Sequence, residues 1–145
     1  MSKKGKGDGI RLIIQTDGAA RGNPGPAGIG MVFLEEDGTL VAERKKFIGH
    51  ATNNVAEYRA LIEALKYARE MGATQVTVQA DSELMVRQMT GQYKVRDAGL
   101  RPLYEEARRL AAGFASFAIR HVPREENRRA DELANMAIDE KGRGE

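Results

Sequence analysis

Two spacings of hydrophobic residues alternate along the chain, one with the period of strands and one with the period of helices. Apolar runs and apolar–polar alternation predict five strands, at residues 10–17, 29–35, 40–47, 75–80 and 116–122. Asp37-Gly38, a strong hairpin signal, lies between the second and third of these stretches. The first three strands are therefore expected to pair antiparallel, in sequence order.

Apolar residues three and four positions apart predict four helices, at about residues 52–71, 81–89, 100–112 and 127–139. Gly72 follows the first of them, where a glycine commonly ends a helix. The order of elements is then βββαβααβα. A meander followed by alternating helices and strands predicts an α/β fold with a mixed five-stranded sheet flanked by helices.

A glycine- and proline-rich segment, residues 18–28, follows the first strand. We expect it to be a loop, because its glycines and prolines interrupt both helices and strands. The segment has no Gly-Lys-Ser/Thr ending and leads into a strand rather than a helix. A phosphate-cradling nucleotide-binding protein is therefore a distant alternative.

The 145 residues are enough for one domain with a sizeable core. We expect residues 10–140 to form that single domain, between a disordered basic leader at residues 1–9 and a frayed tail at residues 141–145. No apolar run approaches membrane-spanning length, and no apolar stretch follows the basic N-terminus as it would in a secretory signal. We expect a cytoplasmic monomer with no membrane association and no obligate protein partner.

The charge balance and the absence of cysteine narrow the chemistry. Lys and Arg number 23 against 21 acidic residues, and the net charge of +2 is weak evidence for an anionic partner. The chain has no cysteine, which excludes disulfides, a thiolate zinc site and a cysteine nucleophile. The candidate catalytic and metal-binding residues must therefore be side chains other than cysteine.

Four acidic residues lie at the ends of strands or near the starts of helices: Asp17, Glu57, Asp81 and Asp131. Each has a structural alternative. Asp17 would support a turn, and Glu57 would complete a capping box with Asn54. Asp81 would be the N-cap of the second helix, and Asp131 would interact favourably with a helix dipole.

Two features favour convergence of these acids on a metal site. Glu57 shares a helical face with Ala60 and Leu61, where a carboxylate is costly unless it is paired or bound to a cation. Asp81 ends a buried strand and would lie beside Asp17 if their strands are neighbours. Clustered carboxylates repel one another, and an all-oxygen ligand set suits Mg²⁺ or Mn²⁺.

Four sequence motifs together resemble the ribonuclease H family, type 1. They are TDG at 16–18 with GNPGPAG at 22–28, TNNVAE at 52–57, DS at 81–82 and NRRADELA at 127–134. The motifs come in the family's order, on the expected elements, and span most of the chain. The resemblance implies a ribonuclease H-like catalytic domain over residues 10–140.

The same resemblance implies that Asp17, Glu57, Asp81 and Asp131 are the family's four catalytic, metal-binding carboxylates. It also implies two Mg²⁺ ions per site with substrate bound, or Mn²⁺ in their place. One ion would activate a water for attack on an RNA phosphate, and the other would stabilise the leaving 3′ oxygen. The expected activity is hydrolysis of the RNA strand of RNA/DNA hybrids, which leaves 5′-phosphate and 3′-hydroxyl ends.

Five residues match positions at which the family contacts the hybrid: Gly18, Asn23, Thr52, Asn53 and Asn54. Thr52 matches a residue that holds a DNA-strand phosphate, and the others match residues that contact the hybrid through its minor groove. Asn53 and Asn54 are also good helix caps, and the two roles are compatible.

The segment 119–127 lacks the glycine-flanked histidine that many family members carry before the last aspartate. In this respect it resembles the archaeal-type and related bacterial branch of the family. In that branch an arginine at the position of Arg124 is a candidate for assisting the reaction. The help would be electrostatic, because arginine does not exchange its proton near pH 7. His121 is a weaker candidate, and a structural role at a strand end is favoured for it.

The connector 91–99 is too short for the basic insertion of larger family members. Lys94, Arg96 and Arg101 remain there, either as binding residues or as a solvated charged surface. Glu83 stands where the family often has a glutamine that touches the substrate. We therefore expect weaker substrate binding or a different anchoring surface.

Two rival functions follow from these departures. A broader nuclease with the same site would also cut double-stranded RNA. A hybrid-binding module without catalysis is the second rival, but it would gain nothing from a carboxylate cluster that faces phosphate. The preferred interpretation is a metal-dependent endoribonuclease that acts on RNA/DNA hybrids.

Overall fold

The computed structural model describes the backbone of residues 9–144 and the side chains of residues 9–141. The disordered leader predicted for residues 1–9 lies outside the described residues, apart from Gly9, and stays a prediction. Within the described part of the chain, no helix is both long and apolar enough to cross a membrane.

The order of elements is the predicted one. The strands are β1 (Ile10–Ala20), β2 (Gly25–Leu34), β3 (Leu40–Ala51), β4 (Ala73–Ala80) and β5 (Ser116–His121). The helices are α1 (Asn53–Glu70), α2 (Glu83–Met89), α3 (Arg101–Ala112) and α4 (Arg128–Gly144), with a short 3-10 helix, η2 (Arg124–Glu126), between β5 and α4.

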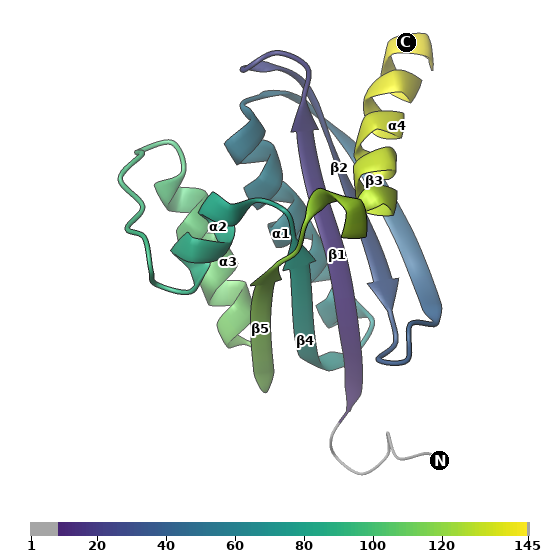
Figure 1. Ribbon diagram of the computed structural model, residues 1–145, viewed down its shortest axis with the longest axis vertical. Coiled ribbons are helices and arrows are strands. Elements are labelled where there is room, and N and C mark those ends of the chain that lie inside the picture. The colour runs from purple at the N-terminus through teal and green to yellow at the C-terminus, as the bar shows by residue number, and fades with distance from the viewer. Residues whose placement is uncertain (1–8, 145) are drawn as a thin grey trace.

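The five strands form one mixed sheet in the order β3-β2-β1-β4-β5. β1 lies at its centre, antiparallel to β2 and parallel to β4. β3 pairs antiparallel with β2, and β5 pairs parallel with β4. α1 and α4 pack on opposite faces of the sheet, with α4 over β2 and its neighbours (Figure 1). The predicted mixed five-stranded sheet flanked by helices is confirmed.

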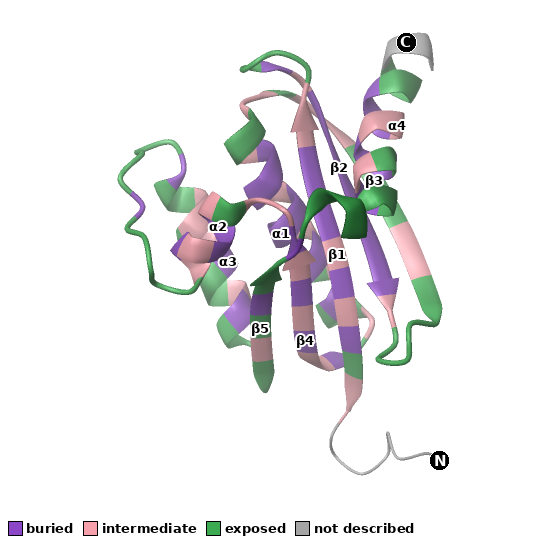
Figure 2. Ribbon diagram, viewed as in Figure 1, coloured by how far each residue is buried: buried purple, intermediate pink, exposed green. Residues whose placement is uncertain are grey.

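The core lies between α1 and the central strands. α1 buries one side of its length, including Leu61 and Leu65, against apolar residues of β1 and β2 such as Ile14 and Phe33. Figure 2 shows the buried residues running through β1, β2 and α1, while the turns at the sheet's ends are exposed. Burial of this apolar area is the main force that holds α1 on the sheet.

The loop predicted for residues 18–28 is mostly wrong. β1 continues through Gly18 to Ala20, and β2 begins at Gly25, so that only residues 21–24 form the turn. Glycines inside strands often mark a close approach of another backbone. Here a Cβ on Gly28 would lie 2.3 Å from the carbonyl oxygen of Ala134 in α4. The glycines therefore make room for helices rather than interrupt the strands.

Two predicted boundaries also differ from the structure. β3 extends to Ala51 rather than residue 47, because its pairing with β2 continues as far as Gly25–Ala51. α4 continues to Gly144 rather than ending at residue 139, so the helix includes most of the predicted tail.

Candidate active site

Asp17 lies on the central strand, on the face that α4 covers. It pairs with Gly30 of β2, and its side chain is only 5% exposed. The alternative in which Asp17 supports a turn is wrong, since the strand continues for three residues beyond it. A buried carboxylate in the middle of a sheet needs a compensating partner.

Glu57 reaches Asp17 from α1. Thr52 is the N-cap of α1, and its hydroxyl accepts a hydrogen bond from the Val55 amide at 3.2 Å. The predicted capping by Asn53 or Asn54, with Glu57 completing a capping box, is therefore wrong. The Glu57 side chain is instead buried, and its Oε1 accepts a hydrogen bond from the Gly18 amide at 3.2 Å.

Gly18 makes this contact sterically feasible. A Cβ at this position would lie 2.3 Å from the carbonyl carbon and oxygen of Ala56. The backbone of α1 therefore rests directly on β1 where Glu57 meets Asp17. The substrate contact predicted for Gly18 stays a prediction, and packing against α1 is the role that the structure shows.

Asp81 follows the last residue of β4. Ala80 pairs with Thr16 in the parallel β1–β4 ladder, so the next residue of each strand carries one of the acids. Ser82, rather than Asp81, is the N-cap of α2, and its hydroxyl accepts a hydrogen bond from the Met85 amide at 3.2 Å. The predicted alternative of Asp81 as an N-cap is thus wrong. Its carboxylate does not cap α2 and is available as a ligand at the end of β4.

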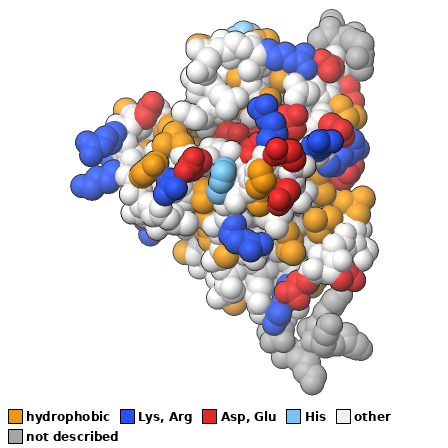
Figure 3. Space-filling model, viewed as in Figure 1, with side chains coloured by type: hydrophobic (Ala, Val, Ile, Leu, Met, Phe, Trp, Pro, Cys, Tyr) orange, Lys and Arg blue, Asp and Glu red, His pale blue; other side chains and the backbone are white. Residues whose placement is uncertain are grey.

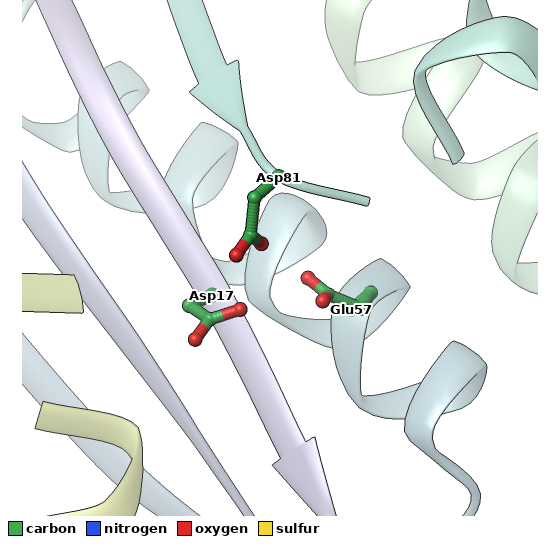
Figure 4. A group of neighbouring side chains, drawn as sticks. All are labelled: Asp17, Glu57 and Asp81. Carbon is green, nitrogen blue, oxygen red and sulfur yellow. The ribbon is translucent and has the colours of Figure 1, made fainter. Parts of the chain in front are cut away.

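The carboxylates of Asp17, Glu57 and Asp81 converge. One oxygen from each lies within 4.8 Å of the others, and Figure 4 shows the three side chains pointing toward a common centre from β1, α1 and the end of β4. Three carboxylate oxygens at this spacing fit a hard divalent cation such as Mg²⁺ or Mn²⁺. The residues present therefore suit the metal that the sequence predicts.

Asp131 lies beside this group rather than within it. It occupies the first turn of α4, where its Oδ1 accepts a hydrogen bond from Asn135 Nδ2 at 3.3 Å. It also lies close enough to Asp17 to contribute to the raised pKa of that carboxyl group. The structure thus brings all four predicted acids to one place, three in a tight cluster and the fourth on the α4 side of Asp17.

Burial and mutual repulsion make the cluster costly without a cation. Burial first, and then the charges of Glu57 and Asp81, raise the pKa of Asp17 from 3.8 to about 11. Burial and the charge of Asp81 raise the pKa of Glu57 from 4.5 to about 8, against opposing hydrogen bonds from Asp17 and the Gly18 amide. A divalent cation among these oxygens would favour their charged forms.

The predicted substrate residues, other than Gly18, gather at the start of α1. Asn23 Oδ1 accepts a hydrogen bond from the Asn53 amide at 3.0 Å, which ties the β1–β2 turn to this helix end. Asn23, Asn53 and Asn54 are exposed, and Thr52 is half-buried. The β1–β2 turn and the start of α1 therefore present polar groups within two helical turns of Glu57.

His121 is the last residue of β5 and Arg124 the first of η2, and both are exposed. Among the described residues, none forms a hydrogen bond or ion pair with the guanidinium of Arg124. Figure 3 shows Asp and Glu side chains gathered near the middle of this face with Lys and Arg side chains around them. With no such partner in the described part of the chain, this arginine is available for a phosphate.

The remaining candidate substrate-binding residues lie outside the cluster of acids. Glu83 accepts a hydrogen bond from Arg87 at 2.8 Å, so its carboxylate is paired along α2. Lys94 and Arg101 line an open hollow of about 360 Å³ with Val95 and Tyr104. Arg101 donates to the carbonyl of Val95 at 2.7 Å. These cations lie on the connector and α3, apart from the four acids.

The sequence motifs include Asn127 but assign it no role. In the structure it is completely buried, and its Nδ2 donates a hydrogen bond to the carbonyl of Thr16 at 2.8 Å. Its Oδ1 and the Thr16 hydroxyl have no hydrogen-bond partner among the described residues. A polar residue just before a helix suggests only a cap, so the sequence does not reveal this contact to β1.

This fold and carboxylate arrangement place the chain in a known family. Residues 15–137 match the reverse transcriptase-like family. The chain belongs to that family, among its ribonuclease H members. The resemblance that its motifs predicted is thereby confirmed.

Three relatives illustrate the similarity. Ribonuclease HI of Halobacterium salinarum is 48% identical over 91% of this chain and 66% of its own length. Bifunctional protein Rv2228c of Mycobacterium tuberculosis is 48% identical over 90% of this chain and 36% of its own length. Ribonuclease H of Roseobacter denitrificans is 31% identical over 88% of this chain and 95% of its own length. The chain thus spans less than two thirds of the first two proteins.

Two solved structures extend the comparison to three dimensions. The crystal structure of RNase H1 from Halobacterium salinarum matches with a TM-score of 0.88 and 48% identity, over 90% of this chain and 98% of that one. LC11-RNase H1, crystallised in complex with an RNA/DNA hybrid, matches with a TM-score of 0.86 and 47% identity, over 90% and 98%. The fold is that of type 1 ribonucleases H.

Proposed function

We propose that this chain is a metal-dependent endoribonuclease that hydrolyses the RNA strand of RNA/DNA hybrids. The observation that carries the proposal is the convergence of three carboxylates within 4.8 Å. A binding module would gain nothing from this cluster, because unneutralised carboxylates repel a phosphate backbone. The relative crystallised with an RNA/DNA hybrid supports the choice of substrate.

Asp17 on β1, Glu57 on α1 and Asp81 at the end of β4 would bind Mg²⁺ or Mn²⁺ through their carboxylates. Asp131 would add a ligand from α4. When two such ions are bound with substrate, they supply an activated water and neutralise charge at the scissile phosphate. The proposed products carry 5′-phosphate and 3′-hydroxyl ends.

The other residues would position the hybrid. Asn23, Asn53 and Asn54 present amide groups suited to the 2′-hydroxyls and base edges of a shallow minor groove. Thr52 would contact a phosphate of the DNA strand while it caps α1. Arg124 would stabilise negative charge at the phosphate, because its guanidinium has five donors and keeps its proton. We also propose a monomer, because one chain supplies all four acids.

The test is cleavage of four end-labelled substrates: RNA/DNA, RNA/RNA and DNA/DNA duplexes and single-stranded RNA. Each is incubated with Mg²⁺, Mn²⁺ or EDTA. Asp81→Asn removes one charge from the cluster. Asp37→Asn is its matched control, since it makes the same change at an exposed acid in the turn between β2 and β3, outside the cluster.

We expect cutting of the RNA strand of RNA/DNA only, which is lost in EDTA and in Asp81→Asn and kept in Asp37→Asn. Cutting of RNA/RNA as well would replace hybrid specificity with a broader nuclease activity. Tight binding of the hybrid without cutting in either metal would overturn the proposed catalysis. A cytoplasmic location stays a prediction from the sequence.

A further inference from the structure

Asn127 connects the two elements that carry Asp17 and Asp131. It lies immediately before α4 and is completely buried. Its side-chain Nδ2 donates to the Thr16 carbonyl of β1 at 2.8 Å. Its own main-chain carbonyl accepts a hydrogen bond from the Asp131 amide at 3.2 Å. One residue therefore holds β1 next to Asp17 and the helical turn that carries Asp131.

The contact is made where the β1–β4 ladder stops. Thr16–Ala80 is the last pair of that ladder, and beyond it the chain turns away at Asp81. On the other side of Asp17, the Gly18 amide donates to Glu57. The peptide groups before and after Asp17 are thus each bound by a side chain from a different helical region.

We propose that Asn127 is a positioning residue that sets the placement of Asp131 relative to Asp17 and thereby the affinity of the site for divalent metal. The proposal rests on the metal site of the proposed function. It concerns a residue that holds ligands in place and does not itself touch metal or substrate. Groups that orient metal ligands in this way commonly change metal affinity or activity by about 10–100-fold when they are altered.

The hydrogen bonds of Asn127 favour positioning over simple packing. Asn127 Oδ1 is buried without a hydrogen-bond partner among the described residues. An unpaired buried polar atom costs stability, so a carboxamide is a poor choice for packing alone. What the carboxamide alone provides is a directed bond to the Thr16 carbonyl.

α4 has other attachments, so loss of this one bond should leave it folded on the sheet. Arg129 forms a two-point ion pair with Glu43 of β3, at 2.8 and 2.9 Å. Leu133 packs with Val32 of β2 in a second apolar cluster. Asn127→Ala is therefore expected to alter the position of Asp131 more than the overall fold.

The experiment compares the wild type with Asn127→Ala and with Val76→Ala. Val76 is buried in β4 at a distance from the strand ends, so its truncation lowers stability without touching the acids. Metal binding is measured by calorimetric titration of Mn²⁺ at a fixed temperature, and melting temperatures are measured with and without Mn²⁺. Cleavage of the hybrid gives kcat and KM separately.

We expect Asn127→Ala to need about 10–100-fold more Mn²⁺ for half-saturation of the site, which is the Mn²⁺ midpoint. Its kcat should fall at fixed metal, and its KM for the hybrid should stay within about twofold, because uniform substrate binding is not affected. Val76→Ala should lower the metal-free melting temperature and keep the wild-type Mn²⁺ midpoint. Should Asn127→Ala not fold, Asn127→Ser, which retains a small polar group, takes its place.

An unchanged Mn²⁺ midpoint in Asn127→Ala, or an equal change in Val76→Ala, would overturn the positioning role. Both results leave the proposed function intact if the wild type binds Mn²⁺ and cuts the hybrid. A wild type that shows neither Mn²⁺-dependent stabilisation nor cleavage would instead overturn the proposed function and this inference with it.

Discussion

Gly30 lies directly opposite Asp17 in the β1–β2 ladder, and its missing side chain leaves the space that α4 occupies. A Cβ on Gly30 would lie 2.2 Å from the carbonyl oxygen of Ala130. The next residue of α4 is Asp131. Gly18 has the same relation to α1, whose Ala56 precedes Glu57. Each helix therefore packs closely on a strand glycine, and this packing places its acidic residue next to Asp17.

Gly30→Ala tests this geometry. The added methyl group must displace α4, because the clashing atoms are backbone rather than a flexible side chain. We expect a loss of about 1–3 kcal/mol of stability together with a fall in hybrid cleavage as Asp131 moves from Asp17. Chemical denaturation and initial cleavage rates provide the measurements. Gly113→Ala, where the nearest atom lies at 3.3 Å, should change both much less.

Asp17→Asn should abolish cleavage and stabilise the metal-free protein. The substitution removes the carboxyl group that burial and three neighbouring acids make costly to ionise. The gain at neutral pH is at most about 4 kcal/mol, the cost of protonating a carboxyl with its pKa near 4 at pH 7. Melting in EDTA and cleavage in Mg²⁺ are measured together. Full Mg²⁺-dependent activity in this variant would refute the assignment of the metal site.

The metal-free protein should lose stability as the pH rises. The folded-state pKa values of Asp17 and Glu57, about 11 and about 8, lie above their ordinary values of 3.8 and 4.5. The folded state therefore holds protons that the unfolded state releases, so this contribution is full below about pH 4 and is lost as the pH rises through the folded values.

Melting temperatures in EDTA between about pH 5 and pH 9 measure this loss. Asp17→Asn should show a shallower decline, because one of the two raised groups is gone. Saturating Mg²⁺ should also flatten the decline in the wild type, because a bound cation stabilises the charged carboxylates. A wild-type melting temperature that rises over this range in EDTA would contradict the raised pKa values.

Arg124→Ala should slow cleavage by about tenfold, which corresponds to about 1.4 kcal/mol of lost stabilisation of the reacting phosphate. Arg124→Lys should recover part of the rate, since the positive charge remains but the fork of donors does not. Neither variant should change the Mn²⁺ midpoint. Arg120→Ala, which removes an exposed arginine from β5, is the control. Equal losses in the Arg120 and Arg124 variants would indicate general charge rather than a specific contact.

The hydrophobic pattern was sufficient for the order of elements and drew attention to two of the four acids, while the full set of four came from the family motifs. Glu57 stood out because a carboxylate shared a helix face with core residues, and Asp81 because it ended a buried strand. Those signals are local, since burial of a face shows in the spacing of its own residues. The meander predicts the antiparallel pairing of the first three strands, whereas the sequence leaves open which of them pairs with β4.

The extents of β1 and β2 were not predictable from the same signals. Gly18 and Gly28 look like strand breakers, and the reason for each lies in a helix that is distant along the chain. The partner of Asn127 is Thr16, 111 positions away, and nothing near either residue indicates it. Thr52, rather than either adjacent asparagine, has the extended backbone and the hydroxyl contact of the N-cap, and residue type alone does not distinguish the three.

The four acids come from segments spread over most of the chain, on β1, α1, the end of β4 and α4. The complete ligand set for a divalent ion therefore forms only after β1 has paired with β4 and α4 has packed on the sheet. Ions that bind only this final arrangement stabilise the native state without assisting the steps that lead to it. We expect divalent metal to slow unfolding and leave the folding rate nearly unchanged. The concentration of available metal would then determine the lifetime of the folded state.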